Sequence, residues 1–169
     1  MRQENRFHDA CKNGELEVVE LLLRRGADIN QSNKLGMTPL YFACRWGQLA
    51  VVDLLLTKGA SINPTSDDEV NPLCVACEYG HRNIVEFLLD KGFILNQVRQ
   101  CEPTPLYMAC QEGKLQVVEL LLDRGAAINQ TVHGGVTPLY IACQEGYRDI
   151  AQLLLSRGAN LNQANQRGL

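Results

Sequence analysis

Residues 104–129 read TPLYMACQEGKLQVVELLLDRGAAIN, and this stretch recurs along the chain at a fixed period of 33 residues. The 169 residues divide without a gap into five units, and four final residues, 166–169, begin a sixth. The five units are residues 1–33, 34–66, 67–99, 100–132 and 133–165. Self-similarity at one fixed period is the sequence signature of stacked structural units. We therefore expect a single repeat domain over residues 1–169.

Each unit carries the signals of two short helices. Thr104 precedes Pro105, and threonine is a good N-cap while proline is favoured at the first helical position. The apolar run that follows ends at Gly113, a residue type that suits the left-handed position after a helix. A second run, LQVVELLLD, has apolar residues at helical spacing and ends near Gly125. The amide of the recurring asparagine, Asn129 here, is expected to bond loop backbone that no helix satisfies.

The pattern TPLYxAC…G…VVxLLLxxGAxIN at a period of 33 resembles the ankyrin repeat, and the resemblance covers the whole chain. It implies an all-α solenoid of stacked helix-turn-helix units with projecting hairpin-like loops. It also implies a non-catalytic function in protein–protein recognition. A further implication is that the recurring asparagine is a substrate for intracellular asparagine hydroxylation, although its structural role already explains it.

The chain departs from the family pattern at several positions. The family's TPLH is TPLY here, which removes the usual hydrogen bond between threonine and imidazole. The third unit has Phe93 and Ile94 where Ala and Asp are usual, so we expect less regular loops there. The first unit looks capped, because His8 and Asp9 stand where the second has Tyr and Phe. The last unit lacks such a cap, so we expect a fragment of a longer array; an end packed against another molecule is the alternative.

Composition argues against several classes of protein. Sixteen basic and 19 acidic residues give a net charge of −3, so we expect no nucleic-acid partner. No stretch approaches the ~20 apolar residues that a membrane helix needs, and no signal peptide is visible at the N-terminus. The seven cysteines are odd in number. Together with the missing export signal, this favours a reducing environment, the cytoplasm or the nucleus.

Five of the seven cysteines follow the repeat, each directly after an alanine in the expected first helix. They are Cys11, Cys44, Cys77, Cys110 and Cys143. Packed helices lie ~8–10 Å apart, whereas a disulfide needs Cα atoms within ~7 Å, so we expect five separate, buried, reduced thiols. The alternative is a zinc or redox site at Cys74, Cys77 and His81, a CxxC with a nearby histidine. Cys101 falls in a loop tip and is the first candidate for a reactive thiol.

No catalytic constellation is present. The sequence contains no HExxH, P-loop, GxSxG or GxGxxG motif, so we expect neither enzyme activity nor a cofactor or metal. The alternative function is that of a regulatory or targeting segment of a larger enzyme, channel or microbial effector.

The resemblance implies that a partner protein binds at the loop tips and the concave helix face, including the exposed ends of the first helices. These are the positions at which the units differ most. The predicted binding residues are Leu35, Met37, Arg45, Trp46, Asp67, Asp68, Glu78, Tyr79, Glu112 and Glu145. Trp46 is the only tryptophan, Tyr79 is its counterpart one unit later, and Trp, Tyr and Arg are enriched among binding hot spots. The alternative for Trp46 is that it only covers a neighbouring loop.

Charge changes along the chain. Residues 34–66 carry three bases and one acid, residues 67–99 three bases and six acids, and residues 100–132 two bases and four acids. An aromatic and basic patch beside an acidic stretch predicts a partner with a basic segment, bound by a monomer.

Overall fold

The computed structural model describes residues 2–61, 71–96, 103–132 and 134–162. Within these residues the regular structure is all helical, which confirms the predicted all-α repeat architecture. In the described part of the chain ten helices follow one another in pairs, one pair in each unit. The pairs are α1 (Arg2–Asn13) and α2 (Leu16–Arg24), α3 (Pro39–Arg45) and α4 (Leu49–Thr57), α5 (Pro72–Tyr79) and α6 (Arg82–Asp90), α7 (Pro105–Gln111) and α8 (Leu115–Asp123), α9 (Pro138–Gln144) and α10 (Arg148–Ser156).

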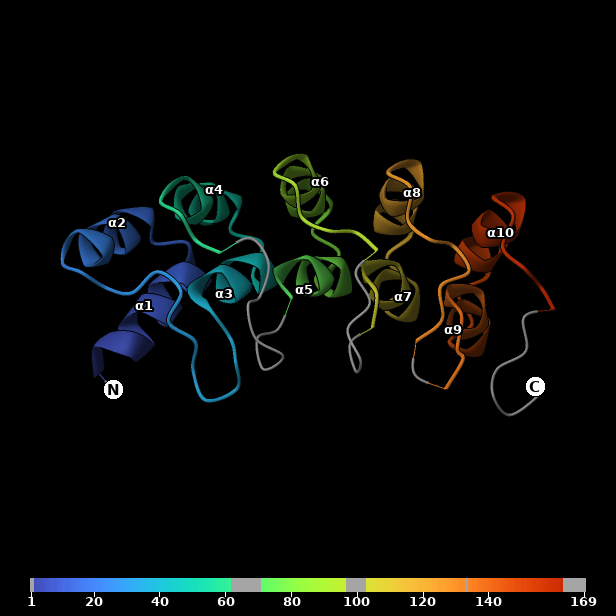
Figure 1. Ribbon diagram of the computed structural model, residues 1–169, viewed down its shortest axis with the longest axis horizontal. Coiled ribbons are helices and arrows are strands. Elements are labelled where there is room, and N and C mark those ends of the chain that lie inside the picture. Colours follow the sequence, from blue (N-terminus) through green and yellow to red (C-terminus); the bar gives the residue numbers. More distant parts are fainter. Residues whose placement is uncertain (1, 62–70, 97–102, 133, 163–169) are drawn as a thin grey trace.

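The helices lie in two rows (Figure 1). The first-helix row contains α1, α3, α5, α7 and α9, and each of these helices packs against the next in the row. The second-helix row, formed by the even-numbered helices, covers the first row on one side. The longest helix, α1, has 12 residues, so no described helix has the length and apolarity that crossing a bilayer requires.

Side-chain caps start the first helix of each later unit. The hydroxyl oxygens of Thr38, Thr104 and Thr137 accept hydrogen bonds from backbone N–H groups three residues later, at 3.1–3.2 Å. In the third unit Asn71 takes this place, and its Oδ1 accepts from the N–H of Leu73 at 2.9 Å. The predicted N-caps are therefore confirmed, and asparagine replaces threonine without loss of the cap.

Glycine is required where the first helix turns into the second. Gly47 has a φ of +75°, and a Cβ added there would lie 2.9 Å from Cε1 of His81 in the next unit. Both the left-handed backbone and the close imidazole exclude a side chain at this position. The predicted glycine terminator therefore serves the contact between units as well as the turn.

The recurring asparagines, which stand 33 residues apart, join the loops of successive units. The Oδ1 atom of Asn30 accepts from the backbone N–H of Ser61 at 2.8 Å, and Oδ1 of Asn96 accepts from the N–H of Ala127 at 2.9 Å. The amide of Asn96 also donates to the carbonyl of Gly125 at 3.1 Å. The expectation that these side chains bond loop backbone is confirmed for Asn30, Asn96 and Asn129, and the bonded backbone belongs to the following unit. Asn63 lies outside the described residues.

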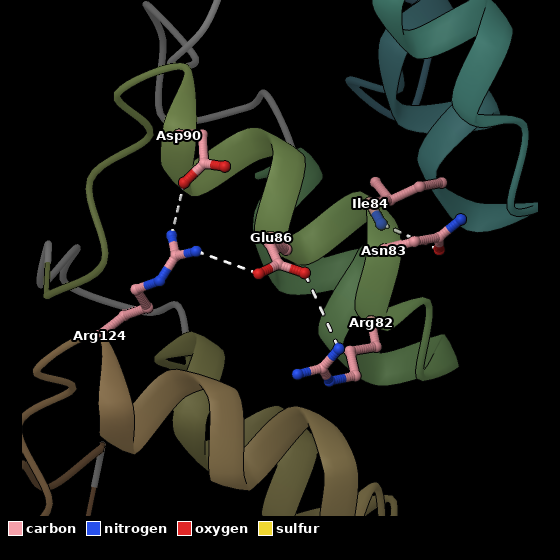
Figure 2. A network of polar contacts seen from close by, with 6 residues as sticks. All are labelled: Arg82, Asn83, Ile84, Glu86, Asp90 and Arg124. Atoms are coloured by element: carbon pink, nitrogen blue, oxygen red, sulfur yellow. Dashed lines mark hydrogen bonds and ion pairs between the residues drawn. The ribbon is translucent and has the colours of Figure 1, made fainter.

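Charged side chains join the second-helix row on its exposed surface. The Arg124 guanidinium reaches back one unit, with Nη1 2.7 Å from Oδ1 of Asp90 and Nη2 3.2 Å from Oε1 of Glu86 (Figure 2). One unit later, Arg157 lies 2.8 Å from Asp123 in the equivalent contact. These pairs are solvent-exposed, so each contributes at most about 1 kcal/mol.

The core is built from small residues in the first-helix row and leucine and valine in the second. Ala43, Ala76 and Ala109 are fully buried, as are Leu55 and Leu88. Small side chains allow close approach between neighbouring helices, while the larger aliphatic side chains fill the space between the two rows. These residues form one core cluster that runs through the described part of the stack.

Four of the five repeating thiols are buried, and one is not. Cys11, Cys44, Cys77 and Cys110 are fully buried, but Cys143 is exposed. Each buried thiol lies on a helix that the next first-row helix covers, whereas no described residue covers α9 in this way. The prediction of five buried thiols is therefore wrong for Cys143. Cys101 lies outside the described residues.

Thiol modification of the native chain should follow this difference. Burial raises the pKa of Cys110 to about 12, so at pH 8 about one thiol in ten thousand is the reactive thiolate. We expect iodoacetamide to modify Cys143 and to spare Cys110 until the chain unfolds. The native chain is exposed briefly to iodoacetamide, and peptide-resolved mass spectrometry then measures the labelling of Cys143 and Cys110. A sample unfolded in urea is the control. Equal native labelling of the two residues would contradict the placement of α9.

The first and third units depart from the others in ways that the structure explains. His8 is buried, its Nε2 donates to the carbonyl of Gln31 at 2.9 Å, and its ring lies 5.0 Å from that of Phe42. His8, which replaces the tyrosine of the second unit, therefore packs in the core, whereas Asp9 is exposed. In the third unit Phe93 is buried and Ile94 is exposed. The less regular loops expected there fall mainly on residues outside the described ranges.

Candidate functional site

The ends of the first-row helices carry the exposed aromatic side chains predicted to bind a partner. Trp46 is 48% exposed and Tyr79 is 38% exposed. Residues 33 positions apart take the same place on successive helices, so these helix ends form one line across the row. We call this line the helix-end surface; it contains Lys12, Arg45, Trp46, Glu78, Tyr79, Glu112 and Glu145.

Arg45 is held between two tyrosines. Its Nη1 donates to the hydroxyl of Tyr41, one turn earlier on α3, at 3.0 Å, and its guanidinium carbon lies 4.9 Å from the centre of the Tyr79 ring. The hydrogen bond with Tyr41 raises the pKa of Arg45, so the side chain stays charged. Attraction between the cation and the ring quadrupole joins α3 to α5 at this surface.

Trp46 makes the same kind of contact one unit earlier. Nζ of Lys12, at the end of α1, lies 4.7 Å from the centre of the Trp46 ring. The indole thus takes part in a contact between units and still leaves nearly half of its surface exposed. An exposed cation–aromatic pair contributes about 0.5–1 kcal/mol, so the contact orients the ring more than it stabilises the fold.

Tyr79 packs against an imidazole that is itself fixed. The rings of Tyr79 and His81 are stacked with centroids 6.5 Å apart, and Nε2 of His81 donates to the carbonyl of Arg45 at 3.0 Å. Burial, followed by the nearby Glu78 carboxylate, raises the pKa of Tyr79 and keeps its hydroxyl protonated. Arg45, Tyr79 and His81 therefore form one ordered cluster across α3, α5 and the start of α6.

The alternative zinc or redox site gains no support from the geometry. The imidazole of His81 is engaged with the Arg45 carbonyl, and the Cys74 thiol donates to the carbonyl of Pro103 at 3.4 Å. Cys77 is fully buried, and burial raises its pKa well above the ordinary range, which keeps it in the unreactive thiol form. The part of the chain that the structure describes contains no group of three potential metal ligands.

The helical fold and the 33-residue period agree with a comparison with known protein families. A family model described as ankyrin repeats (3 copies) matches residues 7–99 and 93–165. The chain belongs to the ankyrin repeat family. A comparison with curated proteins gives no match. Ankyrin repeats are generally protein–protein interaction modules and are typically non-catalytic.

The other predicted residues of this ankyrin domain are distributed differently. Leu35, at a loop tip, is 68% exposed, whereas Met37 is half-buried and packs against the core. The backbone N–H groups of both bond Oδ1 of Asn33, at 2.9 and 3.1 Å, which fixes the tip. Met37 thus offers less exposed apolar surface than Leu35. Asp67 and Asp68 lie outside the described residues.

The acidic end of the helix-end surface lies on the later ankyrin units. Glu112 and Glu145 follow α7 and α9 directly and are both exposed, while Glu78, at the end of α5, is half-buried. Sequence reasoning left Lys12 out of the candidate set although the contact with Trp46 gives it a place there. The signal was available, because Lys12 stands 33 residues before Arg45 and is also basic.

Proposed function

We propose that this ankyrin repeat domain binds a partner protein through the helix-end surface and the adjoining loop tips, and that it catalyses no reaction. The observation that carries the proposal is the pair of exposed aromatic rings, Trp46 and Tyr79, each with a cation of the preceding unit over its face. Trp, Tyr and Arg dominate the residues at which binding energy concentrates in protein interfaces.

Preorganisation strengthens this assignment. Ordering a long side chain on binding costs about 0.5–1.5 kcal/mol, and groups already ordered in the free protein avoid much of this cost. Arg45 is fixed by Tyr41 and Tyr79, and Tyr79 in turn packs against His81. The helices that carry these groups are packed side by side in one row. The surface therefore presents large side chains at a reduced entropic cost.

The charges of the later units add a preference for basic groups on the partner. Glu112 and Glu145 are exposed on the same helix-end surface. A basic segment of the partner would reach complementary charge there, which favours the encounter and fixes the orientation more than it adds affinity. Binding by a monomer of this chain is part of the proposal.

Replacing Trp46 and Tyr79 together by alanine tests the proposed surface. A partner is first identified by crosslinking and mass spectrometry, and its Kd is then measured for the wild type and the variant. We expect a loss of at least about 30-fold, which corresponds to a hot-spot loss of about 2 kcal/mol. Removing the rings leaves the buried core intact, so the fold should persist in circular dichroism.

The matched control replaces Leu21 and Leu155 by alanine. These side chains are 45% and 44% exposed, as much as the two aromatic rings, but they belong to α2 and α10 of the second-helix row. The control should bind the partner as the wild type does. Unchanged binding by the aromatic variant, or an equal loss in the control, would overturn the proposed surface.

A further inference from the structure

We infer that the helix-end surface takes an extended, charge-segregated protein segment, acidic where it lies over α1 and α3, apolar in its middle and basic over α7 and α9. This inference rests on the proposed function and adds the chemistry of the bound segment and its orientation along the stack.

The charge of the helix-end surface changes sign once along the row. Lys12 lies in the last turn of α1 and Arg45 is the last residue of α3. The exposed carboxylates of Glu112 and Glu145 follow α7 and α9. The two aromatic rings lie between these ends of the line, on α3 and α5. A uniformly basic segment would meet two like charges at the first end, and a uniformly acidic segment would meet two at the other. Only a segment whose charges are segregated in the opposite order complements both ends.

Helix spacing sets the length of the segment. Neighbouring packed helices lie ~8–10 Å apart, so the four steps from α1 to α9 span ~32–40 Å. An extended chain rises ~3.3 Å per residue, so ~10–12 residues cover the line, whereas a helix would need more than ~20. Because the line crosses the first-row helices one after another (Figure 1), an extended segment reaches all five helix ends with the shortest chain.

The cations are placed to receive carboxylates. Tyr41 and Tyr79 hold the guanidinium of Arg45 at 3.0 Å and 4.9 Å, and a fixed guanidinium presents its donors in a fork that matches a carboxylate. The ammonium of Lys12 lies over the Trp46 ring, next along the same line. The exposed parts of the two rings then adjoin the cations, where apolar side chains of the segment would follow its acidic residues.

Two fluorescent peptides of identical composition and ~12 residues test the inference. The segregated peptide has aspartates at one end, leucine and phenylalanine in the middle and lysines at the other end. The mixed peptide alternates the aspartates and lysines around the same apolar residues. Fluorescence anisotropy at low and at physiological ionic strength measures the Kd of each for the whole chain. We expect the segregated peptide to bind about tenfold tighter, with the difference shrinking as salt screens the charges.

Reversing charges on the protein tests whether the basic end of the helix-end surface recognises the acidic end of the peptide. Lys12→Glu with Arg45→Glu should remove the preference and should favour a third peptide with lysines at both ends. Arg24→Glu with Arg25→Glu is the matched control: it changes the net charge equally, at the end of α2 in the second-helix row, and should keep the preference. Circular dichroism of both variants verifies that the helices persist.

Equal affinity for the segregated and mixed peptides would overturn the inference, as would equal effects of the two charge reversals. Failure of the segregated peptide to bind with a Kd below about 1 mM would overturn it too. These failures leave the proposed function intact if the identified partner still depends on Trp46 and Tyr79. If the partner binds the aromatic variant unchanged, the proposed function fails whatever the peptides do.

Discussion

Raising the pH from 8 to 10 is expected to lower the free energy of unfolding of this ankyrin domain by about 5 kcal/mol. The cause is the column of buried thiols. Burial raises the pKa of Cys11 and of Cys110 from 9.0 to about 12, and it also raises the pKa values of Cys44 and Cys77 well above the ordinary range. In the unfolded chain these four thiols are exposed to water and ionise with ordinary pKa values.

The sign follows from the protons bound in each state. Above pH 9 the unfolded thiols lose protons that the folded thiols keep, so the unfolded state gains stability as the pH rises. The stabilisation is complete below the unfolded pKa of about 9 and is lost progressively toward the folded values. At pH 10, which is one unit above the ordinary pKa, the loss is on the order of 1 kcal/mol for each thiol, and four thiols act in the same direction. A loss of this size is a large part of the stability of an ordinary domain.

Urea unfolding followed by far-UV circular dichroism at a series of pH values measures this dependence. Cys44→Ala is the control, because alanine is small and does not ionise. Its unfolding free energy should fall less steeply above pH 9, by about a quarter of the wild-type slope. The ion pairs at Arg124 and Arg157 do not produce the effect, since arginine stays charged at pH 10. A wild-type profile that is flat between pH 8 and 10 would show that the thiols are not held in a dry core.

Replacing Leu88 by alanine is the second change with a large expected effect, a loss of about 2–5 kcal/mol. Leu88 is fully buried on α6, which packs against α5 and α8 in the middle of the stack. The truncated side chain leaves a cavity that its rigid neighbours fill only in part. Each repeat contacts only its neighbours, so weakening the central unit also weakens the coupling between the two halves of the solenoid.

Leu155→Ala is the matched control for this substitution. It removes the same atoms from a side chain that is 44% exposed on α10, and it should cost under about 1 kcal/mol. Urea and thermal unfolding measure both variants, and the Leu88 variant should also unfold over a broader range if its halves separate. Equal losses in the two variants would contradict the burial difference between them.

The sequence alone determined the period, the two helices of each unit, the threonine N-caps and the glycine terminators. These features depend on local backbone chemistry: a threonine before a proline and a glycine at a positive φ act within a few residues. Their repetition at one spacing identified the stack, and with it the burial of Cys44, Cys77 and Cys110. The candidate surface was predictable in part, because Trp46 and Tyr79 stand where other units have Asn or Glu at the end of the first helix.

Only the tertiary structure decided which of the equivalent positions are buried and what they contact. The sequence makes Cys143 and Cys110 look alike, but burial requires a neighbouring unit on that face, and α9 has none among the described residues. His8 looked like a surface cap and is buried, because Phe42 of the next unit packs on its ring. Lys12 reaches Trp46 only because stacked helices bring residues of successive units together. Such contacts are set by how the units pack, and a repeated sequence assigns the same partners to every unit.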